Sequence, residues 1–139
     1  MRTDNPWKKL STQVVYENRW MRIVEDKVIT PTGNDGVYAY LDSKDSVIIT
    51  ALNNKNELYL VHTFAYPDGS WNWELPGGGS EGENPETAAR RELAEETGIS
   101  AKSWQQLGHT RVCNGLMTEK MTTFLARGLS FDKDRKSVV

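Results

Sequence analysis

A run of glycines that opens directly into a sharply delimited helix places the strongest constraint on the fold of this 139-residue chain. The segment 76–82 reads PGGGSEG and predicts a loop, because glycine is a poor helix former. Asn84 is a favourable N-cap, Pro85 suits the first helical position, and Gly98 suits the residue that ends a helix. We therefore predict a helix over residues 85–97, preceded by a glycine-rich loop.

The rest of the chain predicts mainly strands. Short segments rich in β-branched and aromatic residues alternate with turn signals such as PTGNDG at residues 31–36 and NNKN at residues 53–56. One helix among many strands predicts the α+β class, with a mixed β-sheet. Residues 1–12 are predicted to form a loosely held arm. The predicted strands lie within residues 14–30, 37–41, 47–52, 57–64, 71–75, 104–113 and 120–126.

The composition excludes several classes of protein. The apolar runs are too short to cross a bilayer, and the polar N-terminus predicts no secretory signal. Cys113 is the single cysteine, so no intrachain disulfide can form, which predicts a cytoplasmic protein. A net charge of −2 lacks the basic surface that a nucleic-acid polymer needs. A small phosphorylated ligand remains compatible if a metal ion supplies positive charge.

The predicted helix gathers three glutamates in little more than one turn. Glu92 and Glu96 are four residues apart and share a face, and Glu95 lies on its flank. Such a cluster is either a solvated acidic surface or a set of oxygen ligands for a hard cation such as Mg²⁺. The preceding glycines favour the second interpretation, because they let the backbone approach a ligand closely. Arg91 can pair with one carboxylate and fix its rotamer.

These residues fall into a known pattern. Gly77, five residues, Glu83, seven residues and then RELAEETGI at residues 91–99 resemble the complete Nudix box. Over residues 14–129, the YENRW strand, the PTG turn, WELPGG and FLARGL resemble the ADP-ribose or ADP-sugar pyrophosphatase branch of the Nudix hydrolases. The resemblance implies a Nudix fold, a mixed β-sheet sandwiched by helices, although this sequence leaves no residues for the usual C-terminal helix.

The resemblance also implies a domain plan and an activity. One Nudix domain would span residues 1–139, with N-terminal strands in residues 1–45 as a possible dimerisation element and the core in residues 46–139. The activity would be Mg²⁺-dependent hydrolysis of the pyrophosphate in a nucleoside diphosphate linked to another moiety, with ADP-ribose or an ADP-sugar expected first. Mn²⁺ is a possible replacement for Mg²⁺.

Individual roles carry over by position. Glu119, in the loop GLMTEK, resembles the glutamate that acts as a general base or assists a metal; the alternative is a solvated loop residue. The box residues resemble metal ligands and their supports: Glu92 and Glu96 as principal ligands, Glu95 as a further ligand or base, the Gly77 carbonyl as a ligand, Arg91 as the residue that orients the glutamates, and Glu83 as a structural residue.

Two aromatic residues match positions that bind substrate. Trp20 and Tyr38 resemble the aromatics that sandwich the base between the subunits of a homodimer, and the alternative is packing across a hairpin. Trp71 and Trp73 are interpreted as core or rim residues.

The chain also departs from the branch. Residues 63–65 read Thr-Phe-Ala where a Gln-aromatic-Arg triplet is usual, and the LPGG loop is one residue shorter, which leaves open the carbonyl that faces the metal. Two alternative functions are a (d)NTP pyrophosphohydrolase and a non-catalytic nucleotide-binding Nudix module. The full set of glutamates argues against the latter.

Overall fold

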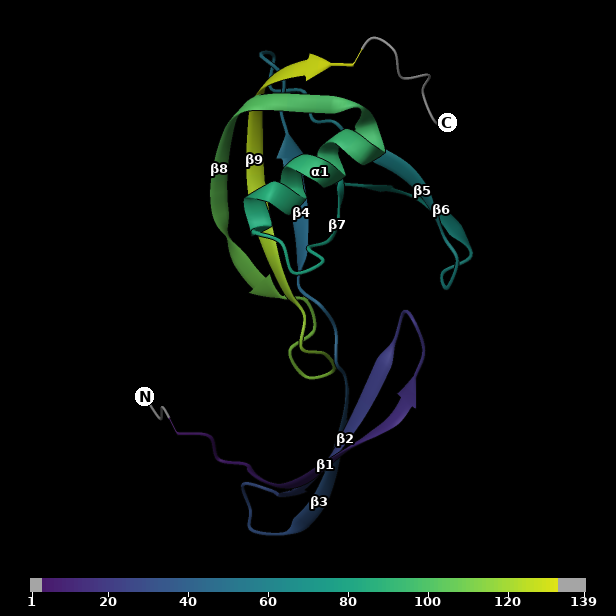
Figure 1. Cartoon of the computed structure of the whole chain (residues 1–139), viewed down its shortest axis with the longest axis vertical. Coiled ribbons are helices and arrows are strands. Elements are labelled where there is room, and N and C mark those ends of the chain that lie inside the picture. Colours follow the sequence, from purple (N-terminus) through teal and green to yellow (C-terminus); the bar gives the residue numbers. More distant parts are fainter. Residues whose placement is uncertain (1–3, 133–139) are drawn as a thin grey trace. The chain divides into compact units, whose positions relative to one another are not determined.

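The computed structural model describes residues 4–132, which form two compact units. Residues 4–43 and 111–119 make up the N-terminal unit, and residues 44–110 and 120–132 make up the sheet-and-helix unit (Figure 1). The expectation that residues 1–139 are a single domain stays a prediction.

The N-terminal unit is built on a three-stranded antiparallel sheet in the order β1-β2-β3. Its strands are β1 (Lys8–Glu17), β2 (Arg22–Ile29) and β3 (Asp35–Leu41). The predicted turn between the last two is confirmed, and Gly33 adopts a φ of 87° there. The predicted arm is wrong from Lys8 onward, because the backbone there pairs with β2; residues 1–3 lie outside the described part. Every residue of β1 is exposed, so burial leaves no alternating pattern in its sequence.

The sheet-and-helix unit contains a mixed four-stranded sheet in the order β7-β4-β9-β8. Its strands are β7 (Gly77–Gly79), β4 (Ser46–Ala51), β9 (Lys120–Phe131) and β8 (Ile99–Arg111). β4 runs parallel to β9 and antiparallel to β7. Helix α1 (Pro85–Thr97) lies across one face of this sheet (Figure 1). The predicted α+β class with a mixed sheet is confirmed, and α1 is the one helix among residues 4–132.

The core lies between α1 and the sheet. Alternate residues of β4 are buried, and they meet the apolar stripe of α1, in which Leu93 is fully buried. Burying a leucine side chain contributes about 1.5–3 kcal/mol, so this contact fixes the helix on the sheet. The buried residues of the core are Val47, Ile49, Ala51, Ala88, Ala89, Leu93, Ile99, Phe124 and Ala126.

Both ends of α1 follow from local chemistry. The Asn84 side chain accepts a hydrogen bond from the Glu86 N–H at 3.0 Å, and Pro85 occupies the first turn. Gly98 adopts a left-handed φ of 68° and donates its N–H to the Ala94 carbonyl at 3.0 Å. The predicted limits of the helix are therefore confirmed.

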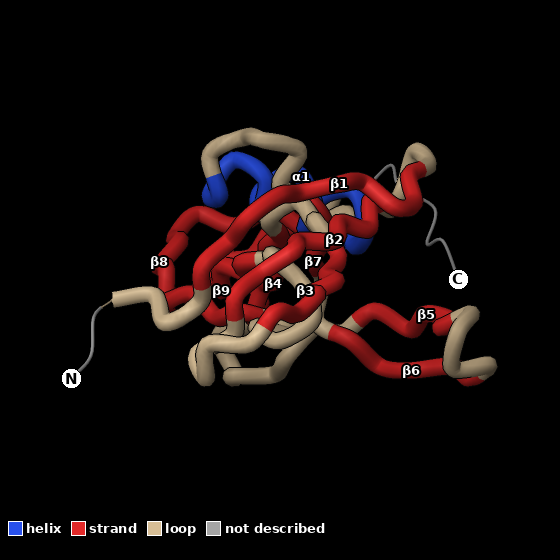
Figure 2. Tube along the Cα trace, turned by 90° about the horizontal axis from the view of Figure 1, so that it is seen from below, coloured by secondary structure: helices blue, strands red, loops and turns tan. Residues whose placement is uncertain are grey.

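A separate hairpin joins β5 (Val61–Ala65) to β6 (Ser70–Glu74) and projects from the four-stranded sheet (Figure 2). The strands predicted at 57–64 and 71–75 are present with shifted limits. Trp71 and Trp73 were interpreted as core or rim residues; at 61% and 66% exposure they are not core residues, and the rim alternative stays a prediction.

Candidate functional site

The site begins with β7, a strand made of three glycines. Residues 77–79 were predicted as loop, but they pair with β4. A Cβ on Gly77 would overlap the carbonyl oxygen of Val47, so only glycine permits this approach. A Cβ on Gly78 would lie 2.7 Å from the Glu92 carboxyl carbon, which shows how closely that side chain packs on the strand.

The register of β7 decides where its polar groups point. The Ile49 N–H donates to the Pro76 carbonyl at 2.8 Å, and residues on an antiparallel strand face their partner alternately. The N–H and C=O groups of Gly77 and Gly79 therefore face away from β4, toward the open edge of the sheet. Side chains from α1 bind both glycines there.

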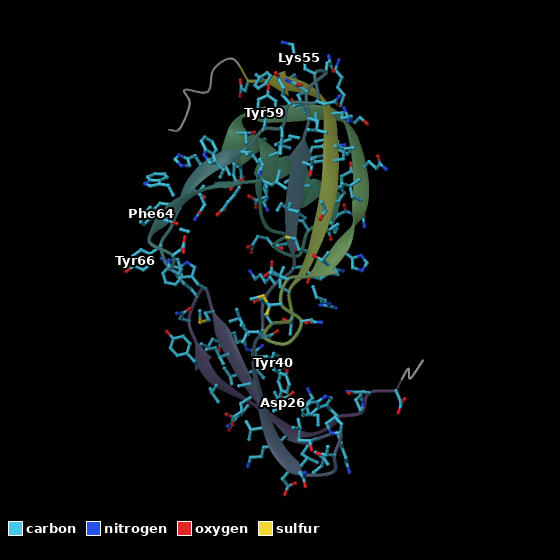
Figure 3. All side chains as sticks on the ribbon, turned by 180° about the vertical axis from the view of Figure 1, so that it is seen from behind. Asp26, Tyr40, Lys55, Tyr59, Phe64 and Tyr66 are labelled. Carbon is cyan, nitrogen blue, oxygen red and sulfur yellow. The ribbon has the colours of Figure 1, made fainter. Side chains whose placement is uncertain are left out.

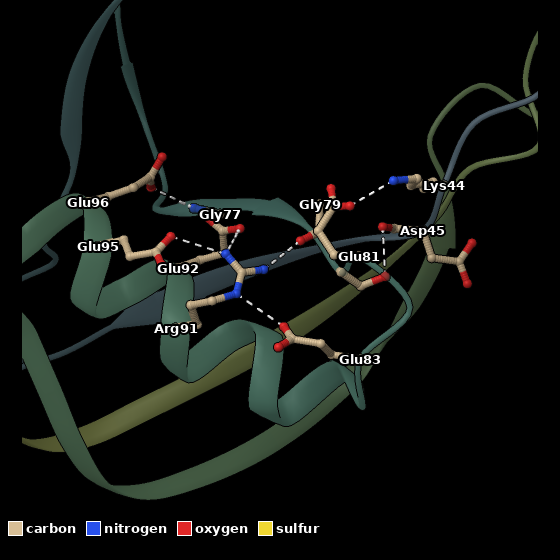
Figure 4. A network of polar contacts seen from close by, with 11 residues as sticks. Lys44, Asp45, Gly77, Gly79, Glu81, Glu83, Arg91, Glu92, Glu95 and Glu96 are labelled. Carbon is tan, nitrogen blue, oxygen red and sulfur yellow. Dashed lines mark hydrogen bonds and ion pairs between the residues drawn. The ribbon is translucent and has the colours of Figure 1, made fainter. Parts of the chain in front are cut away.

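Arg91 is the centre of this polar network (Figure 4). Its guanidinium donates to the Gly79 carbonyl at 2.9 Å and to Glu83 at 3.1 Å. It also binds Glu92 at 2.7 Å and Glu95 at 3.1 Å. The hydrogen bonds that Arg91 donates to Glu83, and then to Glu92, raise the pKa of Arg91. One arginine thus holds three carboxylates and β7 in a fixed arrangement.

Glu96 lies apart from Arg91 and accepts a hydrogen bond from the Gly77 N–H at 2.9 Å. The residue is exposed, but surrounding protein atoms desolvate its carboxyl group, and this raises the pKa of Glu96. The negative charges of Glu92, Glu74 and Glu95 raise it further, and the Gly77 hydrogen bond opposes the shift. Negative charge therefore accumulates around Glu96.

The oxygen atoms available as metal ligands at this site are of the kind that a hard divalent cation prefers. The side chains among them, Glu92, Glu95 and Glu96, are all carboxylates, and Gly77 adds a carbonyl on the open edge of β7. Their mutual repulsion, seen in the pKa of Glu96, is what a cation would relieve. In the structure of residues 4–132, no three Asp, Glu, His or Cys side chains lie close enough together to hold a metal ion.

Asp45, directly before β4, binds both the glycine-rich loop and the first residue of β9, and no sequence motif singled it out. Its carbonyl accepts hydrogen bonds from the Ser80 N–H and hydroxyl, both at 2.9 Å. Its carboxylate accepts the Lys120 N–H at 3.1 Å. The glycine-rich loop and the residue after Glu119 are therefore anchored to the same aspartate.

The remaining predicted residues belong to the N-terminal unit. Trp20 lies in the turn after β1, is 77% exposed and has the Arg19 guanidinium 3.7 Å above its ring centroid. Glu119 follows a loop that is held to β3, because the Thr118 N–H donates to the Leu41 carbonyl at 3.0 Å.

Tyr38 lies on β3, where its hydroxyl donates to the Gly115 carbonyl at 2.8 Å. The Trp7 ring meets the Tyr38 ring edge to face, with centroids 5.4 Å apart. Both rings line a cavity of about 420 Å³, together with Asp26 and Tyr40. A cavity of this size suits a small organic ligand.

Comparison with known proteins identifies the family. The model of the NUDIX domain matches residues 42–134. The chain belongs to the Nudix family. Residues 7–41 match a second model, the nucleoside diphosphate sugar hydrolase N-terminal domain. The resemblance drawn from the box is therefore confirmed, and so is its branch, because the relatives below carry names of that kind.

Two relatives are named ADP-ribose pyrophosphatase. The protein from Mycobacterium tuberculosis is 27% identical over 128 residues, which are 91% of this chain and 62% of the relative. The protein from Bacillus subtilis is 26% identical over 132 residues, covering 94% of this chain and 71% of the relative. The chain thus spans less than two thirds of the Mycobacterium relative.

A solved structure supports the fold. The crystal structure of an ADP compounds hydrolase superposes with a TM-score of 0.83 at 21% identity, and the match covers 99% of this chain and 77% of the other. Within residues 4–132, no helix is long and apolar enough to span a membrane.

Proposed function

We propose that this protein hydrolyses the pyrophosphate bond of a nucleoside diphosphate linked to another moiety, with ADP-ribose or an ADP-sugar as the first substrates to test. The observation that carries the proposal is the arrangement around Arg91, which binds three carboxylates and Gly79. The names of the two relatives support the choice of substrate.

The proposal includes a divalent metal ion, as Nudix hydrolases generally use, and Mg²⁺ is our first choice, with Mn²⁺ as a substitute. Glu92, Glu95, Glu96 and the Gly77 carbonyl would hold it. When bound, such an ion neutralises phosphate charge and lowers the pKa of a bound water. Because Arg91 already binds Glu92 and Glu95, the ion would share these carboxylates with the arginine.

The chain's own residues position the reaction. Arg91 holds Glu92 against Gly78, so that its carboxylate has little freedom. The Gly77 N–H orients Glu96. Glu95 or Glu119 takes the proton from the attacking water, because hydrolysis needs a general base within reach. Asp45 holds the backbone at Ser80, in the glycine-rich loop, and at Lys120, the residue after Glu119.

A Glu96→Gln variant tests the function. Removing one carboxylate should cost several kcal/mol of transition-state stabilisation, which lowers turnover about 100-fold or more. The measurement is nucleoside monophosphate release from ADP-ribose, ADP-sugars and nucleoside triphosphates with Mg²⁺. Glu86→Gln is the matched control on the same helix. Because Glu86 pairs with Arg90, this substitution should leave turnover unchanged. Unchanged turnover in Glu96→Gln would remove the metal assignment, and a preference for triphosphates would overturn the ADP-sugar assignment.

Substrate binding is proposed to involve Tyr38 and Trp20. Tyr38 lines the 420 Å³ cavity beside Trp7, where an aromatic base can stack. Trp20 offers a largely exposed ring that Arg19 covers on one side. The lone cysteine supports placing the protein in the reducing cytoplasm.

A homodimer through the N-terminal strands is also proposed. β1 is an edge strand, it is exposed along its whole length, and Leu10, Val14 and Tyr16 are among its exposed apolar residues. Unpaired edges of this kind readily pair with another chain. Light scattering at micromolar concentration should give twice the mass of one chain. A monomeric mass would contradict the dimer without affecting the proposed reaction.

A further inference from the structure

The glycine-rich loop ends in a tight turn that holds a glutamate in a conformation usual for glycine. The Glu83 N–H donates to the Ser80 carbonyl at 2.8 Å, and the two residues between them have positive φ angles, 49° for Glu81 and 80° for Gly82. Positive φ at both central positions is typical of a type I′ turn, which prefers Asn, Asp or Gly there. Glu81 is therefore strained, and strained residues are frequent at functional sites.

The side chain of Glu81 turns back toward β7 and binds a lysine. A Cβ on Gly79 would lie 3.0 Å from one of its carboxylate oxygens. The other oxygen accepts a hydrogen bond from the Lys44 ammonium at 2.7 Å. This hydrogen bond and the charge of Lys44 lower the pKa of Glu81, and the charge of Arg91 also lowers it. Glu81 thus keeps the Lys44 ammonium close to Gly79.

The backbone beside this ion pair is anchored independently of it. The residue after Lys44 is Asp45, and its carbonyl accepts the N–H and the hydroxyl of Ser80, both at 2.9 Å. Ser80 is buried and directly precedes Glu81. Because these hydrogen bonds hold the loop to β4, Lys44 can exchange Glu81 for another partner while the loop stays in place.

The Lys44–Glu81 pair and the carboxylate site lie along the same strand, within the sheet-and-helix unit. Figure 4 shows Glu96 and this pair at opposite ends of β7, with the Arg91 guanidinium between them. Gly77, which binds Glu96, is two residues from Gly79, a rise of about 7 Å. A pyrophosphate group has a similar length. When one of its phosphates lies at the proposed metal ligands, the other can therefore reach Lys44.

Lys44 is also available for a new partner. Arg91 already binds three carboxylates and the Gly79 carbonyl. Within residues 4–132, Lys44 pairs with Glu81 alone, and its side chain is 73% exposed. An exposed ion pair of this kind adds little stability, so little is lost when it opens. A phosphate carries more negative charge than a carboxylate, and a lysine ammonium is a common phosphate ligand.

We propose that Lys44 binds a phosphate of the substrate, and that Glu81 holds its ammonium beside β7 until the pyrophosphate displaces the carboxylate. This inference rests on the proposed function and adds a substrate-binding residue that lies outside the box. The ammonium would offset phosphate charge at the end of β7 away from the proposed metal ligands. Glu81 would both place the lysine and compete with the substrate for it.

The kinetic test compares the two partners of the ion pair. Lys44→Gln should raise KM for ADP-ribose about 10-fold, because a hydrogen bond to a charged group is lost, and Lys44→Arg should restore most of it. Glu81→Gln should lower KM, by up to about fivefold, because it frees the ammonium. Lys55→Gln is the matched control, since Lys55 is an exposed lysine beyond the other end of β4 (Figure 3), and KM should stay unchanged.

Two results would contradict this exchange of partners. A purely structural ion pair would shift KM in the same direction in Lys44→Gln and Glu81→Gln, because both variants lose the same contact. If Glu81→Gln lowers KM equally in the Lys44→Gln background, its effect is only the removal of a negative charge. The double variant should instead have the KM of Lys44→Gln.

A binding measurement separates this inference from the proposed function. Calorimetric titration with methylenediphosphonate and excess Mg²⁺ needs no turnover. Weaker binding by Lys44→Gln than by the wild type and Lys55→Gln supports the phosphate contact, also if the wild type hydrolyses no nucleotide. Equal binding, or no binding by the wild type, overturns the contact even if hydrolysis is found. Glu81→Gln, which should bind more tightly, keeps the test decisive if Lys44→Gln does not fold.

Discussion

Helix α1 and the β5–β6 hairpin both adjoin Gly77, but different forces hold them. α1 buries Ala88, Ala89 and Leu93 completely and is tied to β7 through Arg91. No residue of the two hairpin strands is fully buried, and the aromatic rings of these strands rest mainly on one another. The carboxylates thus lie on an element that is fixed by burial, whereas the aromatic rings lie on an element held by strand pairing and ring contacts. The contrast shows that two neighbouring elements of one unit depend on different contributions to stability.

The largest effect should come from the helix core. Leu93→Ala should lower the free energy of unfolding by about 2–5 kcal/mol, because it leaves a cavity between α1 and the sheet. Urea unfolding followed by circular dichroism measures the change. A loss below about 1 kcal/mol would show that α1 is not fixed by burial, and the contrast with the hairpin would disappear.

The next largest loss of stability should come from substitutions of the glycines in β7, the strand between the helix and the hairpin in the sequence. Gly77→Ala should cost about 1–3 kcal/mol, because the added methyl meets the backbone of Val47 and Ile48. Gly78→Ala meets only the end of the Glu92 side chain, which can move away if it gives up its hydrogen bond with Arg91. We therefore expect Gly78→Ala to keep most of the stability and lose turnover. Equal thermal stability of the two variants would contradict this assignment of backbone and side-chain contacts.

The smallest effect should come from the hairpin. Phe64→Ala removes one cross-strand ring contact with Trp71, which is worth about 0.2–1 kcal/mol. Thermal unfolding of the variant should therefore lie close to that of the wild type. A loss of stability as large as that of Leu93→Ala would mean that the hairpin belongs to the same cooperative core as α1.

The helix could be predicted from sequence because its limits depend on local chemistry. Asn84, Pro85 and Gly98 act within one or two residues of themselves, and the structure reproduces the predicted limits. The spacing of the box likewise identified the family. β1 was partly missed for the opposite reason: its exposed residues carry no burial pattern, and pairing with β2 is what makes it a strand.

Other features depended on contacts that a sequence does not display. Three consecutive glycines predict a loop, and only the proximity of β4 turns them into β7. The roles of Asp45 and of the Gly79 carbonyl come from backbone groups, which every residue has. The aromatic residues of segment 71–75 correctly predicted a strand, but they do not say which face of the strand is covered.

The open edge of β7 has a consequence for solubility. An unpaired strand edge is a template for association with other chains, and proteins usually block it with charged or bulky elements. Here Glu96 and Arg91 bind the outward groups of Gly77 and Gly79, so charged side chains close the sheet where another strand would otherwise add. The residues proposed to act on substrate thus also protect the protein against edge-to-edge aggregation, and variants that remove them should be examined for aggregation before any loss of activity is interpreted.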